Sequence, residues 1–498
     1  MLGETTRTWP SHWPIKALTP WQERAWDELR QGRSGLVVLP TGGGKTLLVY
    51  LWSYHNLGSL TVVLTPLIAL IEDQVKRARA FGFQAWGMHS GQAATVKQGI
   101  LERIKRKQVQ ILFVTPERFR NESFREVIHK VGLGLLVVDE AHLISQWGYD
   151  FRPDYQRVTS LIEEFKPAQI LALTATATLE VKRDILSQLK LGNGFDVTQS
   201  IVRSNLSLRC SEAVGVEQKR NFITRFWHSP QNQRFDGNNN VDHSVAPPGP
   251  TVTYFSLIKS IYEQRAWFES QATPLWIYHG DLSAKERKKI QKMFQESSKG
   301  VMLATNAFGL GVDKKNIRCV IHFEVPGSIE SYYQEVGRAG RDGYPAWAFL
   351  CYDPEDLLIQ MEFIKWSNPE PDLYRRVWDW LWSHRTHLSS WSVESAKKEL
   401  FFYNQRDFRL ETILKHLEFA GYLIPDKNSF GYRWNDEFSQ SEGFNFSWSG
   451  RDRAKIQHQK LMDLVTFIKN VQVCRMQQIA AYFGESTQAC GQCDVCIK

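Results

Sequence analysis

No apolar stretch of this sequence approaches the ~20 consecutive residues that a membrane-spanning helix needs. Residues 1–20 are polar and contain tryptophan, and they lack the apolar core and small-residue cleavage site of a signal peptide. Cysteine is scarce, with seven in 498 residues, whereas 43% of the chain is hydrophobic. These features predict a folded globular protein of the cytoplasm.

Acidic residues do not balance the basic ones. The formal net charge is +8 and the pI is about 9.0, with the basic residues spread along the chain. One interpretation is a solvated basic surface. The other is a polyanionic partner, because lysines and arginines that displace counterions supply most non-specific affinity for nucleic acid. Charge alone leaves both open.

The chain length favours three domains. In residues 1–205, β-branched runs alternate with helical patterns at Lys45–Tyr54 and Ala69–Ala80. The strand candidates are Gly35–Leu39, Thr61–Thr65, Ile111–Thr115, Leu135–Asp139 and Gln169–Thr174. A second round in residues 206–352 has candidates at Thr251–Phe255, Leu275–Tyr278, Gly300–Ala304 and Cys319–Phe323. This alternation predicts two α/β domains with doubly wound parallel sheets.

The rest of the chain has a different composition. Residues 231–250 are rich in Asn, Gly and Pro, which indicates a surface loop between the two rounds. Residues 353–498 are mostly helical in pattern and rich in tryptophan. A third, mainly helical region is therefore expected there.

A glycine-rich turn lies between the first strand candidate and a helix. Its glycines allow successive backbone N–H groups to point at phosphate oxygens, while lysine and threonine reach the β/γ-phosphates and Mg²⁺. The residues of this phosphate loop are Thr41, Gly42, Gly43, Gly44, Lys45 and Thr46. Leu39 stands where the strict pattern has glycine, and P-T-G-G-G-K-T is the variant that helicase motors use.

Two carboxylates follow the apolar run Leu135–Val138. The carboxyl edge of a parallel sheet is where doubly wound folds bind ligands. Asp139 is expected to hold the Mg²⁺ shell, and Glu140 to orient and deprotonate the attacking water.

The second α/β round carries Arg338 and Arg341 three residues apart on one helical face. A solvated arginine pair is one interpretation. The other is an arginine finger, chiefly Arg341, that acts across the cleft on the ATP site of the first domain, a role typically worth about 10³–10⁵ in rate. That arrangement would couple hydrolysis to movement of the domains.

These motifs together resemble superfamily 2 helicases, and most closely the RecQ family, which implies two RecA-like domains. The resemblance rests also on L-T-P-W-Q at Leu18–Gln22, L-T-A-T-A at Leu173–Ala177 and the A-T-N-A-F-G-L-G-V-D run at Ala304–Asp313. It implies nucleotide contacts for Gln22, Gly311, Asp313 and Gln334. It implies DNA contacts for Thr65, Pro66, Thr115, Pro116, His279 and Thr305.

The segment His142–Pro153 resembles the aromatic-rich loop by which RecQ proteins touch single-stranded DNA and signal to the ATP site. Aromatic side chains offer stacking faces worth about 1–3 kcal/mol per base, and an arginine adds a phosphate or cation–π contact. The alternative is a set of aromatics packed in a core. The DNA-contact candidates are Gln146, Trp147, Tyr149, Phe151 and Arg152.

Four cysteines gather at the C-terminus. Fifteen residues separate Cys474 from Cys490, and Cys493 and Cys496 follow at intervals of three. The spacing suits one tetrahedral Zn²⁺ held by four thiolates. Two disulfides are the alternative, which an intracellular location disfavours. RecQ proteins carry a zinc module with this spacing, expected here at about 450–498.

Residues 387–436 contain two helical patterns, a helix-like run at Leu410–Tyr422 and a candidate β-wing at Leu423–Trp434. The pattern favours a winged helix, a usual reader of duplex DNA, over a helical spacer. It would precede the zinc cysteines, whereas the best-known RecQ layout places a winged helix after them.

These motifs distinguish three classes of function. The first is a non-catalytic scaffold, which would require a broken ATP site. The second is an RNA-directed or non-unwinding ATPase, for which the D-E-A-H sequence and the aromatic loop are not typical. The third is a DNA helicase that uses ATP, Mg²⁺ and structural Zn²⁺. The RecQ resemblance implies 3′→5′ movement and a role in DNA recombination and repair. Single-stranded DNA and duplex junctions are the expected partners of a monomer.

Overall fold

A computed structural model describes residues 9–40, 42–66, 68–89, 91–145, 153–227, 249–271, 274–309, 314–402, 407–426, 428–437 and 451–497. By contacts the chain divides into two compact units. The first joins residues up to Pro326, Glu330–Tyr352 and the segment from Phe467. The second joins Gly327–Ile329 and Asp353–Thr466. The cysteine-bearing C-terminus thus belongs to the unit that contains both α/β domains.

The first domain is built on a sheet of seven parallel strands in the order β3-β4-β2-β5-β6-β1-β7. Their bounds are β1 Gly35–Val38, β2 Thr61–Leu64, β3 Ala85–Met88, β4 Ile111–Val114, β5 Leu135–Val138, β6 Gln169–Thr174 and β7 Phe195–Thr198. The five predicted strands are confirmed to within one residue. The sequence pattern misses β3 and β7: the β3 segment A-W-G-M has no β-branched residue, and β7, F-D-V-T, is only four residues long.

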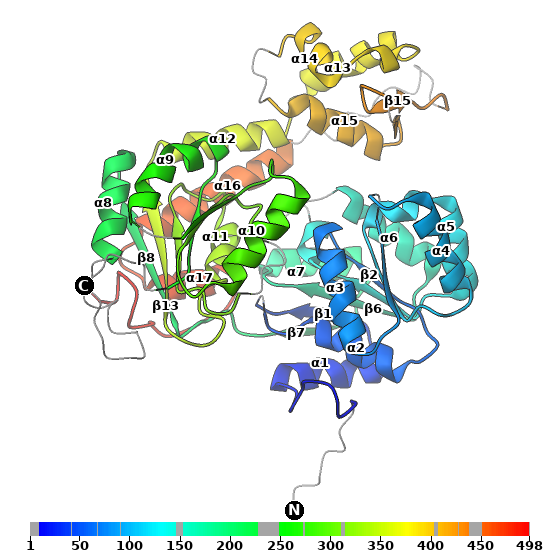
Figure 1. The fold of residues 1–498 in the computed structure, drawn as a ribbon, viewed down its shortest axis with the longest axis horizontal. Coiled ribbons are helices and arrows are strands. Elements are labelled where there is room, and N and C mark those ends of the chain that lie inside the picture. The colour runs from blue at the N-terminus through cyan, green and yellow to red at the C-terminus, as the bar shows by residue number, and fades with distance from the viewer. Residues whose placement is uncertain are drawn as a thin grey trace, which may run out of the picture. The chain divides into compact units, whose positions relative to one another are not determined.

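Helices cover both faces of this sheet (Figure 1). Alternate strand side chains point to opposite faces, so Val37 and Leu36 lie in different apolar clusters. One face carries α1 Pro20–Arg30, α2 Thr46–His55 and α3 Ile68–Ala80. The other carries α4 Ala94–Lys105, α5 Glu122–Val131, α6 Pro153–Phe165 and α7 Leu179–Gln188. The doubly wound architecture is confirmed.

The second domain contains six parallel strands in the order β10-β11-β9-β12-β13-β8. Their bounds are β8 Leu206–Glu212, β9 Thr251–Tyr254, β10 Leu275–Tyr278, β11 Val301–Ala304, β12 Cys319–His322 and β13 Ala346–Tyr352. The helices of this domain are α8 Gly215–Trp227, α9 Ile258–Gln271, α10 Ala284–Glu296 and α11 Ile329–Val336. The four predicted strands are confirmed, and β8 and β13 are two further strands at one edge of the sheet.

The second compact unit is mainly helical. It contains α12 Asp356–Ser367, α13 Pro371–His384, α14 Val393–Glu399, α15 Arg409–Phe419 and the antiparallel pair β14 Leu423–Pro425 and β15 Tyr432–Trp434. An apolar core rich in tryptophan holds α13, α15 and the hairpin together, with Trp378 5.2 Å from Trp434 between ring centroids. Residues 387–436, where the sequence predicts a winged helix, contain α14, α15 and the hairpin, and α13 precedes them. The winged helix and its DNA-reading role stay predictions.

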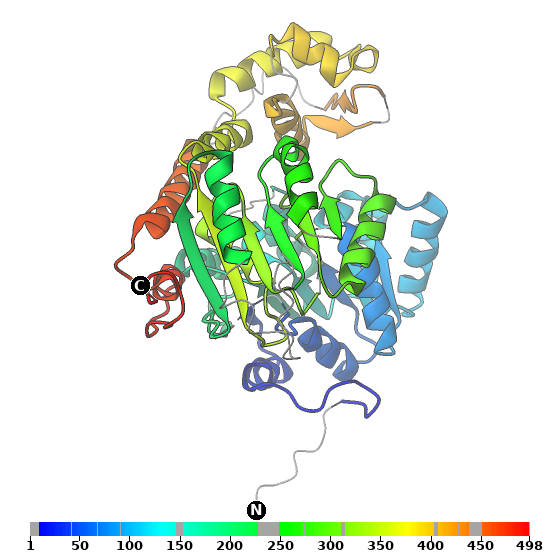
Figure 2. The same ribbon diagram turned by 60° about the vertical axis from the view of Figure 1, so that its left-hand side comes forward.

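The last two helices are α16 Arg451–Lys469 and α17 Arg475–Tyr482. Within the first compact unit, α17 contacts β8, the edge strand of the second sheet (Figures 1 and 2). Among the described residues, no helix combines the length and apolar character that crossing a bilayer demands.

Candidate nucleotide site and cysteine cluster

The phosphate loop joins β1 to α2 in the first domain. Gly42 and Gly44 adopt φ values of +88° and +78°, a region that side chains other than glycine rarely enter. The N–H of Gly43 donates to the carbonyl of Pro40 at 2.9 Å, and α2 begins at Thr46. This conformation places a helix N-terminus at the loop, as anion binding requires. Thr41 lies outside the described residues.

Gln22 of α1 lies against the same loop. Its Oε1 accepts a hydrogen bond from the backbone N–H of Thr19 at 2.9 Å. A Cβ atom on Gly44 would stand 2.8 Å from Gln22 Nε2. The amide is thus fixed beside the glycine loop, although the two segments are separate in sequence.

Asp139 and Glu140 follow β5 at the carboxyl edge of the sheet. Asp139 Oδ2 accepts a hydrogen bond from Gln74 Nε2 at 3.2 Å. Burial, reinforced by the Glu140 carboxylate and opposed by Lys45, raises the pKa of Asp139 to about 6. A buried carboxylate beside a second one favours a cation, so the pair fits the Mg²⁺ that accompanies a bound nucleotide.

Glu140 has a strained backbone, with φ 51° and ψ 48° in the left-handed region. Such a conformation costs a non-glycine residue about 1–3 kcal/mol and is concentrated at functional sites. Glu140 Oε2 lies 3.4 Å from Nδ1 of His142. The same nitrogen lies 2.9 Å from Thr174 Oγ1. His142 therefore connects Glu140 with the L-T-A-T-A segment after β6.

A cavity of about 500 Å³ lies over these groups. The first domain lines it with residues that include Gly42, Gly44, Lys45, Thr46, Asp139 and Glu140. The second domain contributes Gly309, Lys315, Gln334, Arg338 and Arg341. The structure thus brings the phosphate loop, the carboxylates and the arginines of the two predicted domains to one site.

The two arginines occupy different environments. The Arg338 side chain is 3% exposed, and its Nη1 donates to the carbonyl of Gly309 within the second domain. The Arg341 side chain lies against the phosphate loop, since a Cβ atom on Gly42 would be 3.5 Å from Arg341 Cδ. Both arginines line the cavity, and Arg341 is the one whose side chain lies beside Gly42 of the phosphate loop.

Sequence reasoning missed one wall of the cavity. Helix α3 lines it with residues at helical spacing: Leu70, Asp73, Gln74, Arg77 and Ala80. Polar residues on one face of the helix after Thr65 and Pro66 were the available signal. Tyr50, Phe81 and Ile15 complete the apolar part of the lining.

The candidate DNA-contact residues lie at strand ends. Thr65 and Thr115 are buried and follow the neighbouring strands β2 and β4, with Pro66 and Pro116 next to them. His279 and Thr305 are also buried and follow the neighbouring strands β10 and β11. Thr65 and Thr115 thus follow adjacent strands of the first sheet, and His279 and Thr305 follow adjacent strands of the second. The other DNA-contact candidates lie outside the described residues: Gln146, Trp147, Tyr149, Phe151 and Arg152. The nucleotide-contact candidates Gly311 and Asp313 also lie outside them.

The four C-terminal cysteines form one cluster, and none of the seven cysteines, all of which the structure describes, is in a disulfide. The four sulfur atoms lie within 4.8 Å of one another. Cys493 Sγ is 3.9 Å from Cys474 Sγ and 3.4 Å from Cys496 Sγ. Tetrahedral zinc with Zn–S bonds of about 2.3 Å needs sulfurs about 3.8 Å apart. The cluster fits that ion.

The thiols of the cluster lie in different environments. Burial raises the pKa of the Cys474 thiol, but backbone hydrogen bonds from Cys490 and Gln477 outweigh it and bring the pKa down to about 7. Burial raises the pKa of Cys490 to about 12. A bound cation would stabilise both residues as thiolates.

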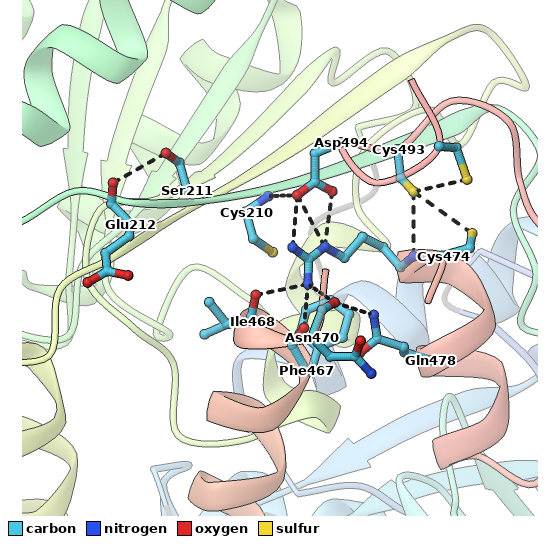
Figure 3. Close-up of polar contacts among 12 residues, drawn as sticks. Cys210, Ser211, Glu212, Phe467, Ile468, Asn470, Cys474, Gln478, Cys493 and Asp494 are labelled. Carbon is cyan, nitrogen blue, oxygen red and sulfur yellow. Dashed lines mark hydrogen bonds and ion pairs between the residues drawn. The ribbon is translucent and has the colours of Figure 1, made fainter. Parts of the chain in front are cut away.

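Arg475 and Asp494 hold the cysteine loop in place (Figure 3). Arg475 is 1% exposed, and its Nη2 lies 2.9 Å from Asp494 Oδ2. Its Nη1 donates to the carbonyl of Ile468 at 3.0 Å, and its backbone N–H donates to Cys493 Sγ at 3.5 Å. One buried arginine thus connects the end of α16, the cysteine loop and α17.

Comparison with protein families matches three parts of the chain. Residues 19–185 match the DEAD/DEAH box helicase model and residues 241–343 match the helicase conserved C-terminal domain. Residues 437–497 match the RecQ zinc-binding model. The chain belongs to the RecQ family of helicases. The cysteine cluster lies within the segment that matches the RecQ zinc-binding model.

Curated relatives agree with the RecQ assignment. The probable ATP-dependent DNA helicase RecS of Bacillus subtilis is 34% identical over 344 residues, which cover 69% of this chain and 65% of the relative. The ATP-dependent DNA helicase RecQ of the same organism is 37% identical over 341 residues, 67% of this chain and 53% of the relative. The RecQ chain thus spans between about half and two thirds of the length of these proteins.

Solved structures show the same fold. The helicase MrfA bound to DNA superposes with a TM-score of 0.55 at 18% identity, covering 87% of this chain and 59% of MrfA. Dbp5 of Saccharomyces cerevisiae bound to RNA and ADP BeF3 gives 0.52 at 18% identity, covering 70% of this chain and 88% of Dbp5. At these identities the likeness concerns the fold of the paired sheets.

Proposed function

We propose that this RecQ-family chain is an ATP-dependent DNA helicase that moves 3′→5′ along one strand and unwinds duplex DNA in recombination and repair. The observation that supports it most is the cavity to which both α/β domains contribute, with Lys45 and Arg341 in one lining. A motor needs such a shared site, because ATP hydrolysis can then change the position of one domain relative to the other.

The residues of the first domain are assigned to binding. The N–H groups of the phosphate loop and Lys45 hold the phosphates, and Gln22 holds the base. Thr46 and Asp139 would hold Mg²⁺, which supplies charge neutralisation on the β- and γ-phosphate oxygens when bound. Gln334 and the Gly311–Asp313 segment are assigned contacts from the second domain.

Glu140 is assigned as the base that orients the attacking water. His142 lies between Glu140 and Thr174, so a shift of the L-T-A-T-A segment would reach the base directly. Arg341 is assigned to the charge that develops on the transferred phosphoryl group. Phosphoryl transfer depends mostly on such positioning and charge stabilisation.

DNA occupancy is proposed to reach this site through the aromatic loop, residues 146–152. Two described residues on either side of that segment make hydrogen bonds within the first domain. Ser145 Oγ donates to Asp184 Oδ2 at 2.6 Å before it, and Tyr155 OH donates to the Asp139 carbonyl at 3.3 Å after it. Tyr155 therefore offers a connection from the residues after the segment to the backbone of Asp139.

We expect Trp147→Ala to lower the DNA-stimulated ATPase rate by at least tenfold while basal ATPase changes little. Loss of one stacked base costs about 1–3 kcal/mol, whereas nucleotide contacts are retained. Steady-state rates with and without single-stranded DNA measure the difference. Equal loss of both rates would show that Trp147 acts in packing.

The polarity is tested with tailed duplexes. A duplex with a 3′ single-stranded tail should be unwound when ATP is added, and the same duplex with a 5′ tail should remain intact. Unwinding of only the 5′-tailed duplex would contradict the proposed direction.

The cysteine cluster is proposed to hold one structural zinc. Four thiolates close the coordination sphere and leave no position for water or substrate. Elemental analysis of protein purified without added metal should give about one zinc per chain, and Cys493→Ser should bring this near zero with poor solubility or weak DNA binding. Nucleotide binding should persist in that variant. Absence of metal in the wild type, with thiols that react only after reduction, would contradict the assignment.

A further inference from the structure

The segment that joins the two α/β domains, Gln199–Asn205, holds the loop that carries Arg341. Arg203 Nη2 donates to the carbonyls of Ala339 at 3.1 Å and Gly340 at 2.7 Å. Asn205 Nδ2 donates to the carbonyl of Gly340 at 2.8 Å. Gly340 directly precedes Arg341. The position of this linker therefore determines where the arginine loop lies.

The other end of the linker adjoins the phosphate-binding domain. The N–H of Gln199 donates to the carbonyl of Val38, the last residue of β1, at 3.0 Å. The linker thus contacts β1, the strand that precedes the phosphate loop, at one end and the loop that contains Arg341 at the other.

Three residues at the end of α17 contact the linker and both domains. Glu485 accepts hydrogen bonds from the Ser200 hydroxyl and, at 3.1 Å, from the N–H of Ile201. The Phe483 ring lies 5.8 Å from the Tyr333 ring of α11. A Cβ atom on Gly484 would meet Leu179 of α7 at 2.8 Å.

Tyr333 of α11 contacts the same part of the linker. Its hydroxyl donates to the carbonyl of Ile201, while the N–H of Ile201 donates to Glu485. The backbone carbonyl of Ile201 is therefore bound by Tyr333 of α11, and its backbone N–H is bound by Glu485.

The module that supplies Glu485 is fixed to the second domain along β8. The N–H of Asp494 donates to the carbonyl of Leu208 at 3.2 Å, and the N–H of Cys210 donates to Asp494 Oδ2 at 3.4 Å (Figure 3). Gln492 Nε2 donates to the carbonyl of Ser204 at 2.7 Å. The segment that carries Glu485 is therefore held against the second sheet by these hydrogen bonds.

We propose that Glu485 is a positioning residue for ATP hydrolysis: by tying the zinc module to Ser200 and Ile201 of the linker, it sets the position of Arg341 over the phosphate loop. This role rests on the proposed ATPase function. An arginine that stabilises only the transition state affects kcat, whereas KM reflects ground-state binding. Small misplacements of such a group can cost up to about a hundredfold in rate.

The test compares three variants of the full chain with the wild type at saturating single-stranded DNA. Glu485→Ala should lower kcat for ATP about tenfold or more, with KM within about twofold. Glu485→Gln keeps an oxygen that can accept from Ile201 and should recover most of the rate. Gln478→Ala is the matched control, because Gln478 lies on α17, shortly before Glu485 in the sequence, and donates to the carbonyls of Asn470 and Val473; its kcat should match the wild type.

Zinc content and the melting temperature of each variant accompany the kinetics, and both should stay at the wild-type values. An unchanged kcat in Glu485→Ala would overturn the role. A parallel loss of zinc or stability, or an equal loss of kcat in Gln478→Ala, would also overturn it by showing a general effect on the module. A wild-type chain without ATPase activity would overturn the proposed function itself, and this role with it.

Discussion

Glu140→Gln is expected to remove nearly all DNA-stimulated ATP hydrolysis while ATP binding stays within about twofold of the wild type. The amide keeps the size and hydrogen-bonding geometry of the side chain but cannot accept the proton of the attacking water. A general base typically contributes about 10²–10⁴ in rate. Multiple-turnover hydrolysis and equilibrium binding of a fluorescent ATP analogue measure the two properties.

Lys45→Ala is the informative companion variant. It removes the flexible cation of the phosphate loop, so hydrolysis and nucleotide affinity should both fall. A difference in binding between the two variants would separate the base from the phosphate ligand. Multiple-turnover hydrolysis retained by Glu140→Gln would show that another group activates the water.

Arg341→Ala is expected to lower kcat by about 10³ or more, the range typical of an arginine finger. The side chain lies against Gly42 of the phosphate loop, where it can meet developing charge. Arg341→Lys should recover little, because an ammonium group lacks the planar fork of the guanidinium. Single-turnover hydrolysis with saturating ATP measures the chemical step.

Arg338→Ala is the contrasting change three residues away. Arg338 is buried and donates to the carbonyl of Gly309, so its removal leaves a buried carbonyl without its donor. That loss costs about 1–3 kcal/mol, and the variant should show a lower melting temperature. Full kcat in Arg341→Ala, or a large rate loss in Arg338→Ala at unchanged stability, would reverse the two assignments.

Local spacing allowed much of the nucleotide site to be predicted. Thr46 begins a helix after a glycine turn, and Asp139 and Glu140 end a buried strand, so each chemical role depends on neighbours a few residues away. The cysteine cluster was predictable for the same reason, because three of its ligands lie within seven residues.

Other parts depended on tertiary contacts that no local pattern contains. Gln74 reaches Asp139 across 65 residues, and the strained backbone of Glu140 is visible only in the fold. Glu485 meets Ser200 across 285 residues. Strand β8 depends on a contact of the same kind, because the N–H of Asp494 donates to the carbonyl of Leu208 on this edge strand.

The central claim is that ATP hydrolysis in this chain drives the separation of DNA strands. The most direct measurement is unwinding of a 3′-tailed DNA duplex and of an RNA duplex of the same sequence, each with ATP, without ATP and with the Glu140→Gln variant. We expect strand separation only for DNA with ATP and the wild-type chain. Unwinding of the RNA duplex in preference to DNA, or ATP hydrolysis without any strand separation, would contradict the account.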